Sequence, residues 1–155
     1  MAVYTKINQK EINTINENFN FEKIISFKGI KAGIENTNYL LKSKKRKYIL
    51  TIFEKRVSQK EIPFFMKLMD NLNSSKINCP NPLKTKKNKY LIKLKNKTAC
   101  IVSFLEGKDK KILKTNDCYL IGKTIAQMHV VTKKMKLNRN NSMGIKNLKP
   151  LLESM

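Results

Sequence analysis

Residues 26–41 have the sequence SFKGIKAGIENTNYLL, and this stretch decides the fold. Two apolar-rich runs, residues 24–30 and 39–41, flank a more polar link, which is typical of a β-hairpin. Because the link occupies residues 31–38, we expect an extended tip rather than a tight turn. Gly33 lets the tip backbone approach a ligand closely. The polar stretch after it presents side-chain amide and hydroxyl donors beside free backbone N–H groups: Glu35, Asn36, Thr37 and Asn38. The tip is a candidate cradle for a phosphate, with a plain polar turn as the alternative.

The segments on either side of the hairpin predict further helices and strands. Upstream, residues 8–11 have the spacing of a capping box, and a short helix follows with Ile12, Ile15 and Phe19 on one face. Downstream, residues 48–53 are β-branched and aromatic and predict a buried strand. Residues 58–72 have helical periodicity. After a connector at residues 73–82, we expect strands at 90–94 and 98–105, joined by a turn at 96–97.

The last third of the chain predicts a linker and one helix. Residues 106–114 are rich in lysine and favour a linker, after which Thr115 or Asn116 caps a helix. We expect its inner face to carry Ile121, Ile125, Met128 and either Val131 or Thr132. Residues 138–155 are weakly patterned. The fold class is therefore α+β: an antiparallel sheet of about five strands with one inserted helix, then a linker and a helix.

The chain of 155 residues carries a formal net charge of +22, which suits a nucleic-acid partner. Its choice of basic residue favours another interpretation. Nucleic-acid surfaces prefer Arg, whose guanidinium forms bidentate hydrogen bonds, yet only Arg46, Arg56 and Arg139 are Arg among 33 basic residues. Lysines are instead scattered with Asn and Ile, as in proteins from AT-rich genomes. We interpret the charge as codon bias on solvated positions, including the runs at 44–47 and 84–89. A basic nucleic-acid-binding protein is the alternative class.

The sequence predicts a cytoplasmic protein with no membrane partner. No apolar run approaches the roughly 18 residues that cross a bilayer, and the amino terminus lacks the apolar core of a signal peptide. Cys79, Cys100 and Cys118 fit this compartment, because no pair has the C-x-x-C spacing and neither a disulfide framework nor a zinc site is indicated. We expect reduced thiols in the core.

Several strings of the sequence resemble one family. They are residues 26–41, already quoted; residues 48–57, YILTIFEKRV; residues 63–65, PFF; residues 101–107, IVSFLEG; and residues 122–129, GKTIAQMH. With the opening MAVYT, they resemble the bacterial homoserine kinases of the aminoglycoside-phosphotransferase-like group. The order of the predicted elements likewise resembles the small lobe of the protein-kinase-like fold. The resemblance implies an ATP-binding small lobe at residues 1–105, followed by a linker and an incomplete larger, catalytic lobe at 106–155.

The resemblance implies an enzyme that uses ATP and Mg to phosphorylate the side-chain hydroxyl of homoserine on the route to threonine. Phosphoryl transfer needs a cover for the phosphates, a cation on them, an adenine slot, metal ligands and a carboxylate base. On this reading the tip, Gly33 and residues 35–38, covers the phosphates. The connector backbone, residues 102–107 with Ser103 and Leu105 as its site residues, faces adenine, with Leu50 and Ile101 as apolar walls.

The charged partners of the phosphates are less clearly marked. Thr51 occupies the strand position where kinase-like lobes have a lysine, and Lys55 lies four residues further on, about 13 Å along a regular strand. Glu61 is the candidate for the helix glutamate that pairs with such a lysine, and capping of the helix is its alternative role. We interpret His129 as structural. The family takes its base and metal ligands from a His-Gly-Asp segment, which this sequence lacks, so we assign no catalytic or metal-binding residue.

The resemblance leaves the acceptor open, because the family's acceptor contacts lie mainly in the larger lobe. Another small-molecule kinase of the same group, acting on an amino alcohol, a sugar or an aminoglycoside, is the nearest alternative. A third is a fragment or pseudogene product, and we expect the chain as given to be inactive alone.

Overall fold

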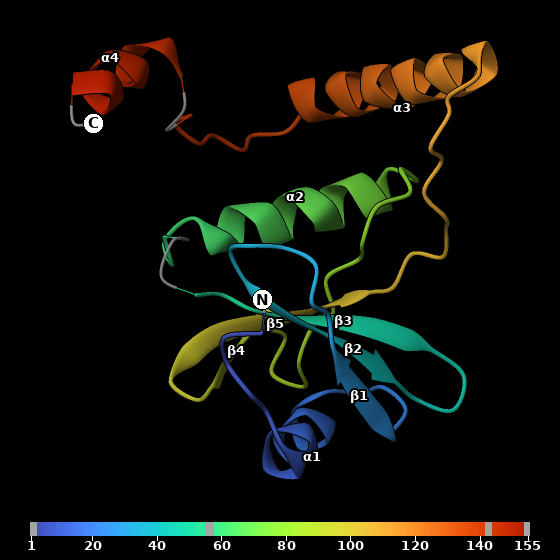
Figure 1. The fold of residues 1–155 in the computed structure, drawn as a ribbon, viewed down its shortest axis with the longest axis vertical. Helices are drawn as coiled ribbons and strands as arrows, with labels where there is room; N and C mark the ends of the chain where they lie inside the picture. The colour runs from blue at the N-terminus through green and yellow to red at the C-terminus, as the bar shows by residue number, and fades with distance from the viewer. Residues whose placement is uncertain (1–2, 55–57, 142–143, 154–155) are drawn as a thin grey trace.

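The computed structural model describes residues 3–54, 58–141 and 144–153 of the chain. Its centre is a five-stranded antiparallel sheet with the strand order β1-β2-β3-β5-β4. In Figure 1, α1 covers one face of this sheet, α2 lies over the other, and α3 lies beyond α2. The predicted α+β class, with a five-stranded sheet and one inserted helix, is confirmed.

The first helix, α1, spans Gln9–Asn18 and begins as the sequence predicts. The Asn8 side chain accepts the N–H of Lys10 at 2.8 Å, and the Glu11 carboxylate accepts the N–H of Asn8 at 2.8 Å. These bonds satisfy amide groups that the start of a helix otherwise leaves free. Ile12 and Ile15 are buried, so the capping box and the apolar face together place α1 against the sheet.

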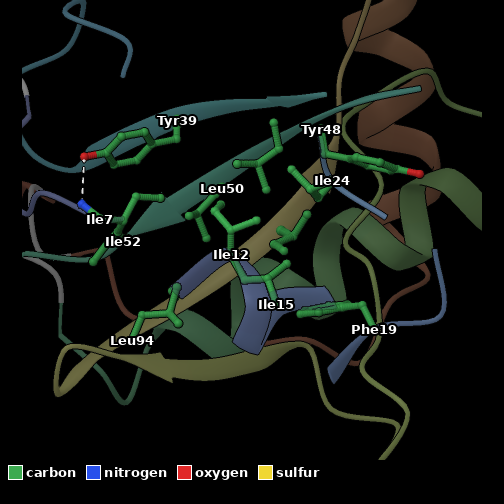
Figure 2. Close-up of a cluster of buried hydrophobic side chains, with 13 residues drawn as sticks. Ile7, Ile12, Ile15, Phe19, Ile24, Tyr39, Tyr48, Leu50, Ile52 and Leu94 are labelled. Atoms are coloured by element: carbon green, nitrogen blue, oxygen red, sulfur yellow. Dashed lines mark hydrogen bonds between the residues drawn. The ribbon is translucent and has the colours of Figure 1, made fainter. Parts of the chain in front are cut away.

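The sheet has one apolar core on each face, because successive side chains of a strand point to opposite sides. The strands are β1, Ser26–Gly29; β2, Thr37–Lys42; β3, Lys47–Ile52; β4, Leu91–Leu94; and β5, Lys97–Ser103. The core on the α1 side includes Leu50, which Figure 2 shows beside Ile12 of α1, and Tyr39, which the same view shows bonded to Ile7. The core on the α2 side includes Ile49, Cys100 and Val102.

The second helix, α2, spans Ile62–Ser74, whereas the sequence predicted a start at residue 58. Pro63 explains the difference, because a proline is tolerated in the first turn of a helix but removes a hydrogen bond further in. At its end, the N–H of Lys76 donates to Asn73 at 2.9 Å and the N–H of Ile77 donates to Leu72 at 3.0 Å. Lys76 has a φ of 61°, which completes a Schellman motif.

The turn between β4 and β5 lies one residue earlier than predicted. Leu94 pairs with Lys97, which leaves Lys95 and Asn96 as the two turn residues. Their φ angles are 49° and 63°, as a type I′ turn requires. Asn adopts a positive φ more readily than Lys does. The sequence therefore predicted a turn at residues 96–97 and missed Lys95, the first residue of the observed turn.

The two last helices, α3 and α4, span Thr115–Lys133 and Ile145–Glu153. Lys114 precedes α3 as its cap, not Thr115 or Asn116, and its N–H donates to Asp117 at 3.0 Å. No residue of α3 is fully buried. Of its predicted inner face, Met128, Val131 and Thr132 are half-buried, on a helix that contacts α2, while Ile121 and Ile125 are exposed. The sequence did not predict α4, which contains a helix-disfavouring residue, Pro150. None of the described helices is long and apolar enough to span a membrane.

The three cysteines are free thiols, but they do not all lie in the core. Cys100 is buried in β5, and burial raises the pKa of its thiol to about 12. Cys79 is partly buried, and burial raises its pKa as well. Cys118 is exposed on α3, which corrects the expectation of a core thiol at that position.

Candidate functional site

The first hairpin has the extended tip that the sequence predicts. Residues 30–36 lie between β1 and β2, and residues 31–35, which include Glu35, are exposed. Gly33 has a φ of 100°, a conformation that residues with a Cβ rarely adopt. A Cβ built on Gly33 would lie 3.9 Å from Nδ2 of Asn38. The tip therefore folds back over the Asn38 side chain.

Thr37 points away from the exposed face of the tip. Its side chain is 0% exposed, and its hydroxyl accepts the N–H groups of Tyr4 at 3.0 Å and Thr5 at 3.1 Å. The same hydroxyl donates to Glu54 at 2.7 Å, so its one donor and two acceptor positions are all used. This corrects the expectation that the Thr37 hydroxyl is a phosphate donor. Strand alternation turns it toward the α1 side of the sheet.

Asn38 points to the opposite face, beside Thr51. The Thr51 hydroxyl donates to Oδ1 of Asn38 at 2.8 Å. Because the carboxamide oxygen is engaged there, the amide nitrogen with its two N–H donors is the group that lies toward Gly33. Thr51 is thus next to the tip, where it orients an amide. Lys55, the cation expected from the sequence, lies outside the described residues.

Glu61 precedes α2 and is joined to a segment far along the chain. Its side chain makes no capping bond, so the capping role is wrong. Instead its carboxylate accepts from the Arg139 guanidinium at 3.0 Å, across 78 positions of sequence. The guanidinium also lies 5.1 Å from the ring centroid of Phe65. Arg139 was not predicted as a site residue, although the rarity of Arg among the 33 basic residues of the chain is a usable signal.

The connector after β5 is partly engaged with its neighbours. The N–H of Ser103 donates to the Asn81 carbonyl, and the Ser103 hydroxyl accepts the Asn81 N–H, both at 2.9 Å. The Ser103 N–H is therefore not free to face adenine, which corrects that part of its predicted role. Phe104 still bonds to Lys47 at 3.3 Å, so Leu105, 40% exposed, is the first residue beyond this pairing.

The two residues predicted as apolar walls of the adenine slot lie on the α1 side of the sheet, away from the hairpin-tip amide of Asn38. Leu50 and Ile101 pair across β3 and β5, and both are 0% exposed in the core against α1. The expectation that they flank adenine is therefore wrong. Ile49 and Val102, one position away in their strands, lie on the α2 side of the sheet. Because side chains alternate along a strand, Asn38 and Thr51 point to this same face.

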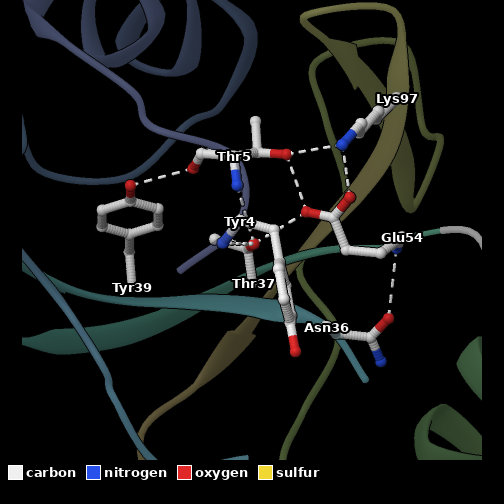
Figure 3. Close-up of polar contacts among 7 residues, drawn as sticks. All are labelled: Tyr4, Thr5, Asn36, Thr37, Tyr39, Glu54 and Lys97. Atoms are coloured by element: carbon white, nitrogen blue, oxygen red, sulfur yellow. Dashed lines mark hydrogen bonds and ion pairs between the residues drawn. The ribbon is translucent and has the colours of Figure 1, made fainter. Parts of the chain in front are cut away.

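Glu54 is a partly buried charge behind the tip that was not predicted from the sequence. Its side chain is 11% exposed and forms an ion pair with Lys97, as Figure 3 shows. Burial opposes its ionisation and is the largest single influence, but hydrogen bonds from Lys97, Thr5 and Thr37 together outweigh burial and lower the pKa of Glu54. No local motif marks Glu54, because these partners are 17 to 49 positions away in sequence.

A metal site is not formed by the residues in the described ranges, where no three His, Cys, Asp or Glu side chains gather to hold an ion. His129 is exposed on α3, and Asp117 bonds to Lys110 and Lys114. The described site therefore offers amide donors at the hairpin tip, an apolar sheet face and an exposed connector.

Comparisons with known proteins place the chain among phosphotransferases. The homoserine kinase of Parvibaculum lavamentivorans is 36% identical over 154 residues, which is 99% of this chain and 48% of the relative. That of Paramagnetospirillum magneticum is 38% identical and covers 99% of this chain and 47% of the relative. The chain thus spans about half the length of the curated relatives that it matches.

Solved structures show the same fold at low identity. Spectinomycin phosphotransferase in complex with ADP and spectinomycin superposes with a TM-score of 0.70 at 16% identity, over 97% of this chain and 46% of the other. A microcompartment-associated aminopropanol kinase gives a TM-score of 0.66 at 11% identity, over 91% of this chain and 48% of the other.

The family profile matches most of the chain. It covers residues 26–153, from the first strand of the sheet through α4. The match therefore includes the hairpin tip, α2, the connector and α3. On this basis the chain belongs to the phosphotransferase enzyme family.

Proposed function

We propose that this chain is the ATP-binding part of a homoserine kinase, which transfers the γ-phosphoryl group of ATP to the side-chain hydroxyl of homoserine in threonine biosynthesis. The observation that carries the proposal is the likeness to relatives named homoserine kinase, 34–38% identical over 94–99% of the chain. Residues 1–105 form the ATP-binding small lobe, and residues 106–155 form the linker and the beginning of the larger lobe. The cytoplasm is the proposed location.

The hairpin tip is the proposed phosphate cover. Backbone N–H groups at Gly33, Glu35 and Asn36, with Nδ2 of Asn38, supply donors to the charged phosphate oxygens. The position of Nδ2 beside Gly33 and its support by Thr51 favour this role. Lys55 is the proposed cation. The Leu105 backbone faces adenine, and Ile49 and Val102 provide the apolar surface in place of Leu50 and Ile101.

The metal ligands and the catalytic base are not among the residues proposed for this chain. The described residues do not fit a Mg²⁺ site, since they gather no cluster of carboxylates. Phosphoryl transfer requires metal neutralisation of the phosphates and a carboxylate for the acceptor hydroxyl. We propose that both come from the half of the relatives that this chain does not match. Glu61, held by Arg139, then connects α2 to the segment after α3.

A fusion protein tests this function. The chain is joined to the unmatched half of the Parvibaculum enzyme, and ADP release is measured with MgATP and homoserine, 2-aminoethanol or spectinomycin. We expect homoserine-dependent release from the fusion and none from the chain alone, because its described residues gather no set of metal ligands. If a folded fusion prefers 2-aminoethanol or spectinomycin, that compound would replace homoserine as the proposed acceptor. A folded fusion that uses no acceptor would contradict the kinase assignment.

Within the fusion, Asn38→Ala should lower kcat/KM for ATP at least about tenfold, since a hydrogen bond to a charged group contributes about 1.5 to 3 kcal/mol. The control is Lys86→Gln with Lys87→Gln, two exposed turn residues, for which we expect a change below about twofold. Lys84 is not a suitable control, because its Nζ lies 3.8 Å from Asp70 and 5.1 Å from the ring centroid of Tyr90. That contact corrects the view of Lys84 as merely solvated.

A further inference from the structure

The amino-terminal segment, residues 3–7, crosses behind the hairpin tip. The N–H groups of Tyr4 and Thr5 donate to the Thr37 hydroxyl, and the Tyr4 hydroxyl donates to the Ile34 carbonyl at 3.0 Å. The Thr5 carbonyl accepts from the Tyr39 hydroxyl at 3.0 Å. These bonds attach the segment to the tip itself and to β2.

The other strand of the hairpin also accommodates this segment. A Cβ built on Gly29 of β1 would lie 2.9 Å from Cγ2 of Val3, closer than real Cβ contacts come. Glycine at this position therefore lets the segment pack directly on β1. The segment thus contacts both strands of the hairpin.

Glu54 links this segment, the tip and β5. Its Oε1 accepts from the hydroxyls of Thr5 and Thr37, both at 2.7 Å, and its Oε2 pairs with Lys97. Its backbone N–H donates to Oδ1 of Asn36 at 3.3 Å. Figure 3 shows that Thr5, Thr37 and Lys97 converge on the Glu54 carboxylate from separate parts of the chain, while Asn36 bonds to the Glu54 backbone. A network of several hydrogen bonds on one partly buried carboxylate holds its members in one arrangement.

Lys97 gives the network a charge that is compatible with a nearby phosphate. An unpaired carboxylate behind the tip would repel an anion bound there. Lys97 is paired with that carboxylate and donates to the Thr5 hydroxyl at 2.8 Å. The pair is neutral overall, so Glu54 holds Thr37 without adding net negative charge to the site.

We propose that Glu54 is a positioning residue for nucleotide binding, which holds the tip, residues 33–38, in the arrangement that receives the phosphates without touching the nucleotide. This inference rests on the proposed function. Thr37 and Asn38 are adjacent and point to opposite faces, so fixing Thr37 also fixes the direction of the Asn38 amide. A tip ordered in advance avoids the entropy that ordering it on binding would cost.

The test compares ADP with adenosine on the 155-residue chain, with Mg²⁺ present and affinities measured by NMR titration. Only ADP has phosphates for the tip to hold. We expect Glu54→Gln to weaken ADP binding at least about tenfold and to change adenosine affinity less than about twofold. Amide exchange at Tyr4 and Thr5, whose N–H groups donate to the Thr37 hydroxyl, should accelerate about tenfold in the same variant, while β3 and β5 stay protected. A general loss of stability would weaken both ligands alike.

A matched control is Glu22→Gln. Glu22 also accepts a hydroxyl, that of Ser43, and an N–H, that of Lys45, but it does so at the opposite end of β2. Its loss should leave ADP affinity unchanged. Thr5→Val is the milder second variant, because it keeps the Glu54–Lys97 pair and removes one hydroxyl. It should weaken ADP binding about threefold in the same selective way, and it decides the question if Glu54→Gln does not fold.

The outcomes distinguish the positioning role of Glu54 from the proposed nucleotide site itself. ADP binding and amide exchange of Tyr4 and Thr5 that are unchanged by Glu54→Gln, or by Thr5→Val when it alone folds, would overturn the positioning role. Equal weakening of ADP and adenosine would overturn it too. A wild-type chain that binds no ADP would overturn the proposed nucleotide site together with the positioning role.

Discussion

Adjacent residues at the hairpin tip have different roles, because a strand turns alternate side chains to opposite faces. Thr37 is buried and uses its whole hydrogen-bonding capacity inside the protein. Asn38, one position on, is bonded through its oxygen to Thr51 and keeps its amide nitrogen toward the tip. A replacement of both residues at once would therefore mix a structural change with a change in ligand contact.

The acid dependence of folding should reveal the Glu54 contacts. Because the pKa of Glu54 is lowered in the folded chain, its contribution to stability is present above the ordinary Glu pKa of about 4.3 and is lost as pH falls through the lower folded-state pKa. We expect Glu54→Gln to reduce the free energy of unfolding by about 2 kcal/mol near neutral pH. The difference from wild type should shrink as the pH falls below about 4.3. Urea unfolding at several pH values measures it, and a difference that stayed constant down to acid pH would contradict the assignment.

Helices α2 and α3 are held in different ways. In α2, Ile62, Met66 and Leu72 are buried, and its last turn is closed by the Schellman motif at Lys76. In α3 no residue is buried, and Tyr119, Leu120 and Ile121 are among the apolar residues that remain exposed. The Arg139–Glu61 pair is a tie between α2 and the segment after α3. The stability of the described fold therefore resides in the sheet, α1 and α2.

Replacement of Lys by Gly should have opposite effects on stability after the end of α2 and inside it. Lys76→Gly should raise the free energy of unfolding by about 0.5 to 1 kcal/mol, because glycine adopts the φ of 61° without a Cβ penalty. Lys67→Gly, at an exposed position inside the same helix, should lower it by about 1 kcal/mol. Urea unfolding of both variants checks the pair. Destabilisation by both would mean that the Schellman motif does not form in solution.

At the scale of the whole molecule, charge and specific contacts are distinct. The net charge of +22 is spread along the chain, whereas two ion pairs join segments far apart in sequence, Lys97 with Glu54 and Arg139 with Glu61. A diffuse charge attracts any polyanion, while recognition of a nucleotide depends on placed donors.

Salt should distinguish these two kinds of binding. We expect the chain to bind duplex DNA without sequence preference at low salt and to lose at least about a hundredfold in affinity between about 50 and 200 mM salt. ADP affinity should fall far less, since fewer charges are neutralised. Fluorescence anisotropy with two unrelated duplexes gives the comparison. Retention of one duplex in preference to the other at the higher salt would favour the nucleic-acid-binding alternative.

The sequence by itself determined the parts of this protein that depend on near neighbours. The capping box at Asn8, the extended tip with its glycine at position 33 and the five strands all follow from residue type and short-range periodicity. Boundaries were less certain where a backbone effect competed with periodicity, as at Pro63 and Lys95. The family likeness also lay in contiguous strings, so it was visible without a structure.

Only the tertiary structure decided which side each candidate residue faces and what it contacts. Register and alternation placed Leu50 and Ile101 against α1 and withdrew Thr37 from the tip surface. Glu54 and Arg139 acquired their partners across long sequence separations, for which no local pattern exists. The physical reason is that hydrogen bonds and ion pairs act over a few ångströms in space, and the chain brings such groups together only when it folds.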